Sequence, residues 1–114
     1  GAIDIPESWL GRKSKENFFV LRVTGDSMYP IYLDGDVVLV LKQNETDYSG
    51  QIAVAIYDDE CATLKKIEYD SARSWVRMLP INMMYSPITI EGERIEHCKI
   101  LGIPKKLIRN IEKY

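Results

Sequence analysis

The sequence is poor in the residues that build metal sites, disulfide frameworks and histidine-dependent catalytic triads. It has two cysteines and one histidine among 114 residues. Cys61 and Cys98 share no short metal-binding spacing, and His97 brings no second ligand with it, so we expect no metal site. Two free, buried thiols are the expectation for the cysteines, although a disulfide between them stays open at this point.

Long apolar runs and a strong charge of one sign are also lacking. No run is long enough to cross a bilayer and no signal-peptide pattern opens the chain, so we expect a soluble, cytoplasmic protein without a membrane partner. The net charge is -2 and the pI about 5.4, which disfavours binding of polyanions by the whole chain. The locally basic segment 99–113 contains no aromatic or Gly-rich nucleic-acid-binding motif among its basic residues. We therefore interpret it as a solvent-exposed edge of the protein.

What is present fits a single globular domain. Hydrophobic residues make up 46% and charged residues 28% of the chain, which is enough to bury a core without a disulfide or a metal. Gly1-Ala2 resemble a tag scar or a fragment boundary and are left out of the fold argument. We expect residues 1–17 to form an N-terminal arm and residues 18–114 to form one domain.

Short apolar runs rich in β-branched residues alternate with turn residues along the chain. Seven such runs, at a spacing of roughly 8–15 residues, predict an antiparallel sandwich or a rolled, barrel-like sheet. The expected strands are residues 18–23, 37–41, 52–57, 63–69, 74–79, 88–91 and 98–103. One short helical turn is expected at 27–32, whereas the tail 104–114 fits either a helix or a continuing strand.

Ser27 lies in a turn, Gly25-Asp26-Ser27-Met28, between two expected strands. A serine hydroxyl is a poor nucleophile at neutral pH and needs a base within hydrogen-bond reach. His97 is the only histidine and lies in a polar, acidic stretch, so a Ser-His-Asp triad stays open but gains no support. Taken alone, the turn favours a structural serine, in a turn or at a helix cap, over a catalytic one.

Two adjacent lysines in an apolar strand offer a different base. A lysine becomes a base near neutrality when burial lowers its pKa by about 3 units, at a cost of about 4 kcal/mol. Side chains alternate along a strand, so only one of Lys65 and Lys66 can face a given cleft. Lys65 shares a face with Thr63, whereas Lys66 shares one with Glu68, which would hold Lys66 charged.

Two acidic turns could be mistaken for metal ligands. Asp34-Gly35-Asp36 and Asp58-Asp59 both lie between expected strands. The residue spacing of a calcium-binding loop is absent from both, so they are interpreted as hairpin turns.

Three segments together resemble the Ser-Lys peptidase domain of the LexA-type repressors (peptidase S24 family). They are Gly25-Asp26-Ser27-Met28-x-Pro30, Asp34-Gly35-Asp36 and Thr63-Leu64-Lys65-Lys66-Ile67. The interval of 38 residues between Ser27 and Lys65 fits the compact repressor branch. Residues 79–87, with Pro80, Asn82, Tyr85 and Pro87, resemble the family's Pro-Asn-Tyr-Pro loop, and residues 99–102 resemble its closing strand.

The resemblance implies a role for each matching residue. Ser27 is the implied nucleophile and Lys65 the implied general base, with no metal and no cofactor. The backbone N–H groups of Ser27 and Met28 are the implied oxyanion donors, and Met28 packs beneath the turn. The implied fold is mostly β, with twisted antiparallel sheets in a rolled, barrel-like LexA/signal-peptidase-type assembly.

The resemblance also implies a biological setting. We expect the C-terminal domain of a LexA-like or phage-type transcriptional repressor, which forms a homodimer and carries latent self-cleavage stimulated by RecA filaments. Operator DNA would be bound by an N-terminal domain that this sequence does not contain. An edge strand near 99–103 is the expected dimer interface by analogy.

One family feature is missing, which keeps other functions open. These proteins cleave themselves at an upstream Ala-Gly or Cys-Gly bond, and neither dipeptide occurs in this chain. Leu10-Gly11 is the only bond to a glycine between the first residue and the first strand, and it looks too close to Ser27. The alternatives are a UmuD-like polymerase accessory subunit, a signal-peptidase-like protease acting in trans, and a non-catalytic dimerisation module.

Overall fold

Seven strands form one continuous antiparallel sheet in the order β1-β2-β7-β3-β4-β5-β6. The computed structural model of the protein describes residues 6–111, so the expectation for Gly1-Ala2 lies outside the described residues. The strands are β1 (Phe18–Arg22), β2 (Val37–Lys42), β3 (Gln51–Tyr57), β4 (Thr63–Tyr69), β5 (Trp75–Leu79), β6 (Ile88–Glu91) and β7 (Cys98–Ile108). The mostly β, antiparallel fold predicted from the sequence is confirmed.

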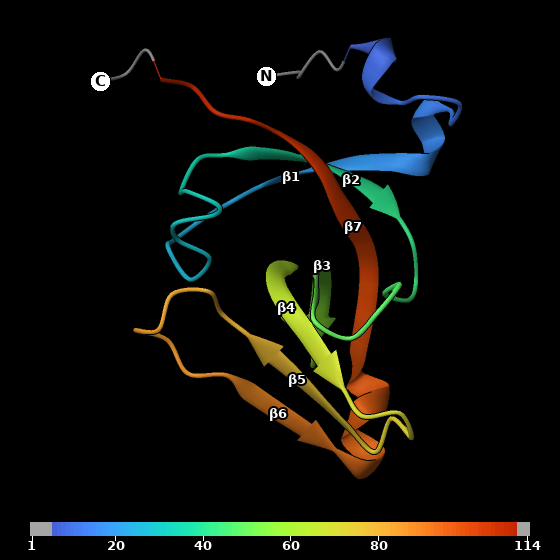
Figure 1. Cartoon of the computed structure of the whole chain (residues 1–114), viewed down its shortest axis with the longest axis vertical. Helices are drawn as coiled ribbons and strands as arrows, with labels where there is room; N and C mark the ends of the chain where they lie inside the picture. Colours follow the sequence, from blue (N-terminus) through green and yellow to red (C-terminus); the bar gives the residue numbers. More distant parts are fainter. Residues whose placement is uncertain (1–5, 112–114) are drawn as a thin grey trace.

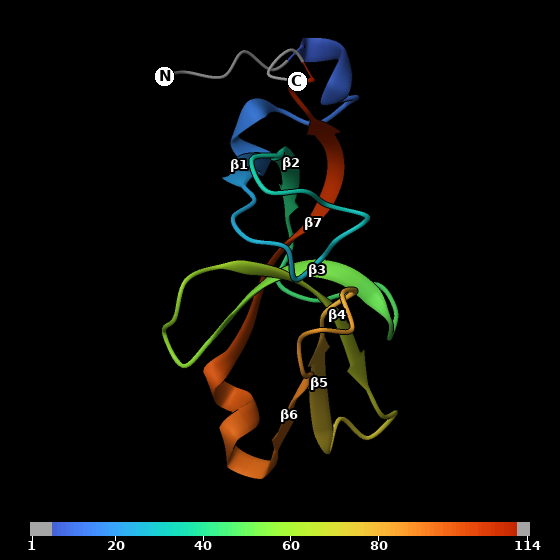
Figure 2. The same ribbon diagram turned by 90° about the vertical axis from the view of Figure 1, so that its left-hand side faces the viewer.

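The sheet is strongly curled and buries apolar residues on both of its faces. One core contains Val38, Val40, Val54 and Leu64. A second core contains residues of opposite parity on β3 and β4, among them Ala53, Ala55 and Ile67, together with Met78 of β5. Apolar residues at neighbouring positions of a strand point to opposite faces, which is why the central strands read as continuous apolar runs. The sheet has two halves, one built on β1 and β2 and the other on β3, β4, β5 and β6, and β7 runs through both. Figures 1 and 2 show the strands of the two halves running in different directions.

The long strand β7 connects the two halves. Its first residues pair with β3 and its later residues pair with β2, and Gly102 lies opposite both Val54 and Lys42. A Cβ atom at Gly102 would lie 2.5 Å from the Leu41 carbonyl oxygen, so the crossing admits only glycine without a shift of the backbone. The expectation of an edge strand at residues 99–103 was therefore wrong, because this segment lies inside the sheet order.

The tail and the arm lie together at the top of Figure 1. The strand alternative for the tail is correct up to Ile108, where β7 ends. The arm carries two short 3-10 helices, η1 (Glu7–Trp9) and η2 (Lys15–Asn17), and the third, η3 (Gly92–His97), precedes β7. Lys106 of β7 lies over the Trp9 ring at 5.7 Å, so the arm packs on the sheet through a cation–π contact.

Candidate active site

Ser27 lies in a hydrogen-bonded turn on the connection between β1 and β2. The Tyr29 N–H donates to the Asp26 carbonyl at 3.1 Å, and the Tyr32 N–H donates to the Met28 carbonyl at 3.0 Å. The Met28–Tyr32 bond joins residues four positions apart and closes the one short helical turn that was expected here, too short to count as a helix. Met28 is 2% exposed and anchors the turn in the core, as expected.

Lys65 reaches the Ser27 hydroxyl from strand β4. Its Nζ lies 3.1 Å from Ser27 Oγ, 2.8 Å from Thr63 Oγ1 and 3.1 Å from the Leu64 carbonyl oxygen. Burial lowers the pKa of Lys65 below its ordinary value, because the charged ammonium loses hydration. The structure thus brings together the two residues that the sequence had singled out, in hydrogen-bond geometry.

Lys66 does not take part in this contact. It pairs with Ile52 across the β3–β4 ladder, whereas Lys65 pairs with Ala53, so the two lysines occupy opposite faces. Glu68, expected as the partner of Lys66, forms its ion pair with Arg77 of β5 at 3.8 Å. The choice of Lys65 over Lys66 follows from the register of the strand.

The N–H groups beside the serine hydroxyl are available as donors. Within residues 6–111, the backbone N–H groups of Ser27 and Met28 donate to no protein acceptor. The carbonyl of Ser27, in contrast, accepts from the N–H groups of Ile81 (3.0 Å) and Asn82 (2.9 Å) in the β5–β6 loop. Tyr85 of the same loop donates its hydroxyl to Asp26 Oδ1.

The sequence reasoning missed this bracing of the serine turn by residues 81–85. The resemblance had pointed to the loop, but no local pattern could indicate that it contacts residues more than fifty positions earlier. Thr63 was noticed only as a residue on the same face as Lys65. Its place two positions before Lys65 was the available signal, because such residues lie side by side on one face of a strand.

Two hollows meet at the Ser27–Lys65 contact, and Thr63 lines both. The smaller, of about 40 Å³, lies beside Ser27, between the end of β1 and the start of β4. The larger, of about 490 Å³, lies beside Lys65 and is lined by apolar side chains that include Met78 and Ile88. We refer to the two hollows on either side of the Ser27–Lys65 contact as the cleft.

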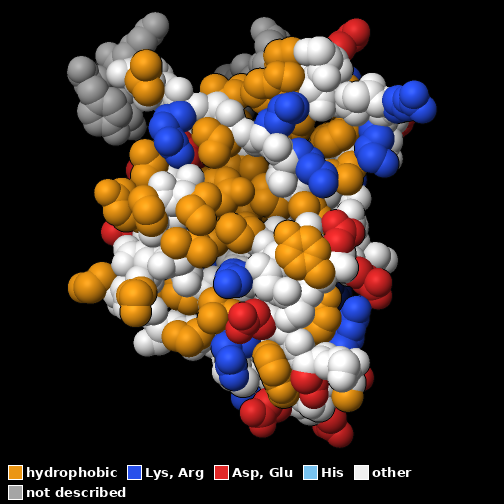
Figure 3. All heavy atoms as spheres, in the orientation of Figure 1, with side chains coloured by type: hydrophobic (Ala, Val, Ile, Leu, Met, Phe, Trp, Pro, Cys, Tyr) orange, Lys and Arg blue, Asp and Glu red, His pale blue; other side chains and the backbone are white. Residues whose placement is uncertain are grey.

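Exposed apolar side chains surround the serine turn. Tyr29 and Ile31 belong to the turn itself, Met83 and Met84 to the β5–β6 loop, and Ile88 to the start of β6. Met83 is 97% exposed. Figure 3 shows hydrophobic side chains gathered over the middle and the left of this face, the side on which Figure 1 draws the β5–β6 loop. An apolar rim of this kind is typical of a surface that binds a peptide or a protein.

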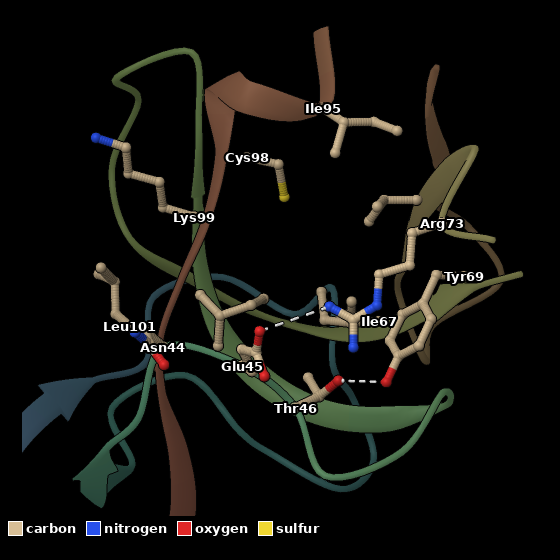
Figure 4. Close-up of a pocket in the computed structure, with 12 residues that line it drawn as sticks. Asn44, Glu45, Thr46, Ile67, Tyr69, Arg73, Ile95, Cys98, Lys99 and Leu101 are labelled. Carbon is tan, nitrogen blue, oxygen red and sulfur yellow. Dashed lines mark hydrogen bonds and ion pairs between the residues drawn. The ribbon is translucent and has the colours of Figure 1, made fainter. Parts of the chain in front are cut away.

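A separate hollow of about 370 Å³ opens between the start of β7 and strands β4 and β5. Figure 4 shows the Cys98 sulfur pointing into it, while Arg73 and Glu45 form an ion pair (3.9 Å) at its edge. Burial raises the pKa of Cys98, which keeps the thiol protonated. Neither Ser27 nor Lys65 lines this hollow.

The other candidate residues lie outside the Ser27–Lys65 contact. The side chain of His97 is 61% exposed and lies 3.5 Å from Asp58, so it does not serve Ser27 as a base. Both cysteines are free, but Cys61 is exposed and not buried as expected. Among the described residues, no three His, Cys, Asp or Glu side chains gather into a group that could hold a metal ion.

The two acidic turns differ in what their aspartates do. Asp58 and Asp59 form the tight β3–β4 turn with positive φ angles of 53° and 59°, which fits the hairpin interpretation. Asp36, in contrast, is 1% exposed and accepts from Arg109 Nε (2.8 Å) and Nη2 (2.7 Å). This ion pair between buried Asp36 and exposed Arg109 ties the chain after β7 to the segment that follows the serine turn, a role the sequence did not reveal.

Comparison with known proteins identifies the family. The family model for Peptidase S24-like proteins matches residues 1–104. The chain belongs to this family. No helix in the described part of this S24-like chain has the length and apolarity needed to span a membrane.

Several LexA repressors are similar to the chain. The LexA repressor of Carboxydothermus hydrogenoformans is 36% identical over 105 residues, covering 91% of this chain and 49% of the relative. That of Desulforamulus reducens is 38% identical over 106 residues, covering 92% and 46%. That of Bifidobacterium adolescentis is 40% identical over 96 residues, covering 83% and 34%. The chain thus spans about a third to a half of the length of these relatives.

Proposed function

We propose that this chain is the peptidase and dimerisation domain of a LexA-like repressor, and that it cleaves its own polypeptide with Ser27 and Lys65. The observation that carries the proposal is the 3.1 Å contact between Lys65 Nζ and Ser27 Oγ at a lysine whose pKa burial lowers. A neutral amine at this distance can accept the hydroxyl proton, which is what a serine nucleophile needs.

Acylation begins when neutral Lys65 takes the proton of Ser27 Oγ. The oxygen forms a bond to the scissile carbonyl carbon, and the electron pair of the carbonyl moves onto its oxygen. The N–H groups of Ser27 and Met28 stabilise that oxyanion. The carbon–nitrogen bond then breaks, and Lys65 returns the proton to the leaving amine, which leaves an ester on Ser27.

Deacylation repeats the same steps with water. Lys65 takes a proton from the water, whose oxygen attacks the ester carbonyl. The ester bond to Ser27 breaks and Lys65 returns the proton to Ser27 Oγ. The product leaves as a carboxylic acid, which loses its remaining proton to the solvent. One lysine thus serves as base and acid in both halves of the reaction, and no metal or cofactor is required.

The proposed substrate is a segment of the same polypeptide upstream of this domain. Leu10-Gly11 is a poor candidate, because Leu10 lines hollows in the arm with Lys13 and other residues that do not border the cleft. Entry of a segment into the cleft would desolvate Lys65 further and increase its neutral fraction, so binding of the segment would gate the chemistry.

The proposed partners follow from the same assignment. They are a second copy of the chain in a homodimer, a RecA filament that stimulates cleavage, and operator DNA bound through another domain of the protein. Cleavage would separate the DNA-binding part from the part that dimerises, which lowers the affinity for a two-fold symmetric operator.

The test uses the natural full-length protein, incubated at pH 7 and pH 10, with fragments followed by mass spectrometry. We expect cleavage that is faster at the higher pH, and we expect Ser27→Ala and Lys65→Ala to abolish or nearly abolish it. The fragment masses would locate the scissile bond. A wild-type protein that stays intact at alkaline pH, also with RecA filaments present, would instead favour a binding and dimerisation module.

A further inference from the structure

Asn82 contacts both peptide units that flank the nucleophile. Its backbone N–H donates to the Ser27 carbonyl at 2.9 Å, and its side-chain Nδ2 donates to the Asp26 carbonyl at 3.0 Å. The side-chain amide is itself held in place, because its Oδ1 accepts from the Met84 N–H at 3.0 Å. A single residue of the β5–β6 loop therefore fixes two successive carbonyl groups of the serine turn.

Fixing these carbonyls also fixes the N–H groups on the other side of each peptide plane. Both peptide bonds are trans, since the only cis bond among the described residues joins Tyr29 and Pro30. In a trans peptide the C=O and the N–H point in opposite directions. The Asp26 carbonyl is therefore opposite the Ser27 N–H, and the Ser27 carbonyl is opposite the Met28 N–H. Both donors point away from Asn82 and are left without a protein acceptor in the described chain.

We propose that Asn82 is a positioning residue that orients the oxyanion donors of Ser27 and Met28 without touching the substrate. The inference rests on the proposed function, because the donors matter only if Ser27 forms a tetrahedral intermediate. Donors aimed at the developing charge before the reaction are what make such sites effective.

Tyr85 and Ile81 support the same arrangement. The Ile81 N–H is the second donor to the Ser27 carbonyl at 3.0 Å, and the Tyr85 hydroxyl holds the Asp26 side chain. Asp26 raises the pKa of Tyr85 above its ordinary 10.0 through the hydrogen bond and its negative charge.

The activity test compares Asn82→Ala and Asn82→Asp with Asn44→Ala in the natural full-length protein. Asn82→Asp keeps an oxygen for the Met84 N–H but replaces the donor to the Asp26 carbonyl with a charged acceptor. Asn44 is an exposed asparagine that lines the separate hollow, and it serves as the matched control. We expect both Asn82 variants to lower the plateau rate of self-cleavage about tenfold to hundredfold, and Asn44→Ala to leave it unchanged.

The pH profile separates positioning from structural damage. Asn82 does not contact Lys65, so in Asn82→Ala the pH midpoint of the rate should stay at the wild-type value while the plateau falls. Loss of the two side-chain hydrogen bonds should lower the melting temperature only slightly. A plateau that falls together with a moved midpoint or a large loss of melting temperature would overturn the proposal, because Asn82 would then only support the fold. An unchanged plateau would overturn it as well.

A second measurement does not depend on cleavage. Amide hydrogen exchange and ¹⁵N relaxation of Ser27 and Met28 are compared between Lys65→Ala and the double variant Lys65→Ala/Asn82→Ala of the full-length protein. We expect faster exchange and greater mobility of the Ser27 N–H in the double variant. The Met28 N–H should change less, because the backbone N–H groups of Ile81 and Asn82 still hold the Ser27 carbonyl. If the wild-type protein does not cleave but these amides respond, the proposed function fails and the positioning role of Asn82 stands. If the amides do not respond, the positioning role fails.

Discussion

Strand β4 presents one lysine to each of its two faces, and the two lysines have different surroundings. Lys65 lies opposite Ala53, within reach of the Ser27 hydroxyl, and burial lowers its pKa. Lys66 lies opposite Ile52, and no contact joins it to Ser27. The difference teaches that the chemistry of this site depends on parity along a strand, because a shift by one residue exchanges the two faces.

The largest difference between the two lysines should appear when each is removed in turn from the full-length protein. Lys65→Ala should lower the rate of self-cleavage about 10²- to 10⁴-fold, the usual contribution of a general base. Lys66→Ala is the matched control and should change the rate by no more than about two- to threefold. Fragment formation on denaturing gels measures both. Equal losses in the two variants would contradict the assignment of Lys65.

The two faces should contribute similarly to stability even though they differ in chemistry. Leu64 belongs to one core and Ile67 to the other, and they are 3% and 2% exposed. Leu64→Ala and Ile67→Ala should each lower the free energy of unfolding by about 2–5 kcal/mol through lost burial and a residual cavity. Urea unfolding followed by circular dichroism measures this. A loss confined to one face would show that the other face is not a packed core.

The pH dependence of cleavage sharpens the comparison further. The reactive form of Lys65 is the neutral amine, so the rate should rise about tenfold per pH unit and level off at the pKa of Lys65. Because burial lowers that pKa, the midpoint should lie below 10.5, the ordinary pKa of a lysine side chain. Initial rates between neutral and alkaline pH give the midpoint. A rate that is independent of pH over this range would exclude Lys65 as the base.

The smallest expected effect is that of the buried Lys65 charge on the stability of the fold. The folded-state pKa of Lys65 lies below its unfolded value, so the unfolded state binds more protons between the two values and stability rises with pH there. Lys65→Met should therefore raise the melting temperature at neutral pH, with a gain that shrinks as the pH approaches the unfolded pKa.

Lys66→Met places the same side chain on the other face and is the matched control for this measurement. The difference between the two variants isolates the burial of the Lys65 ammonium from the general effect of a methionine in β4. A stabilisation by Lys65→Met that stays constant with pH would contradict the linkage argument.

The sequence predicted what depends on local pattern. Strands were found where apolar residues run between turns, and Lys65 stood out because a lysine in an apolar strand is unusual. The pairing of Ser27 with Lys65 required the family resemblance. The bracing by Asn82, 56 positions after Asp26, and the Asp36–Arg109 pair, 73 positions apart, left no local signal, because only tertiary packing brings these residues together. The same holds for the insertion of β7 between β2 and β3.

The place of β7 in the sheet has a consequence for the order of events during synthesis. The turn that carries Ser27 belongs to the half built on β1 and β2, Lys65 belongs to the half built on β3 and β4, and the two halves are joined through β7. A ribosome makes β7 last of the seven strands. A nascent chain that already contains Ser27 and Lys65 therefore lacks the strand that joins their two halves, and under the proposed function we expect self-cleavage to begin only after the last strand has emerged.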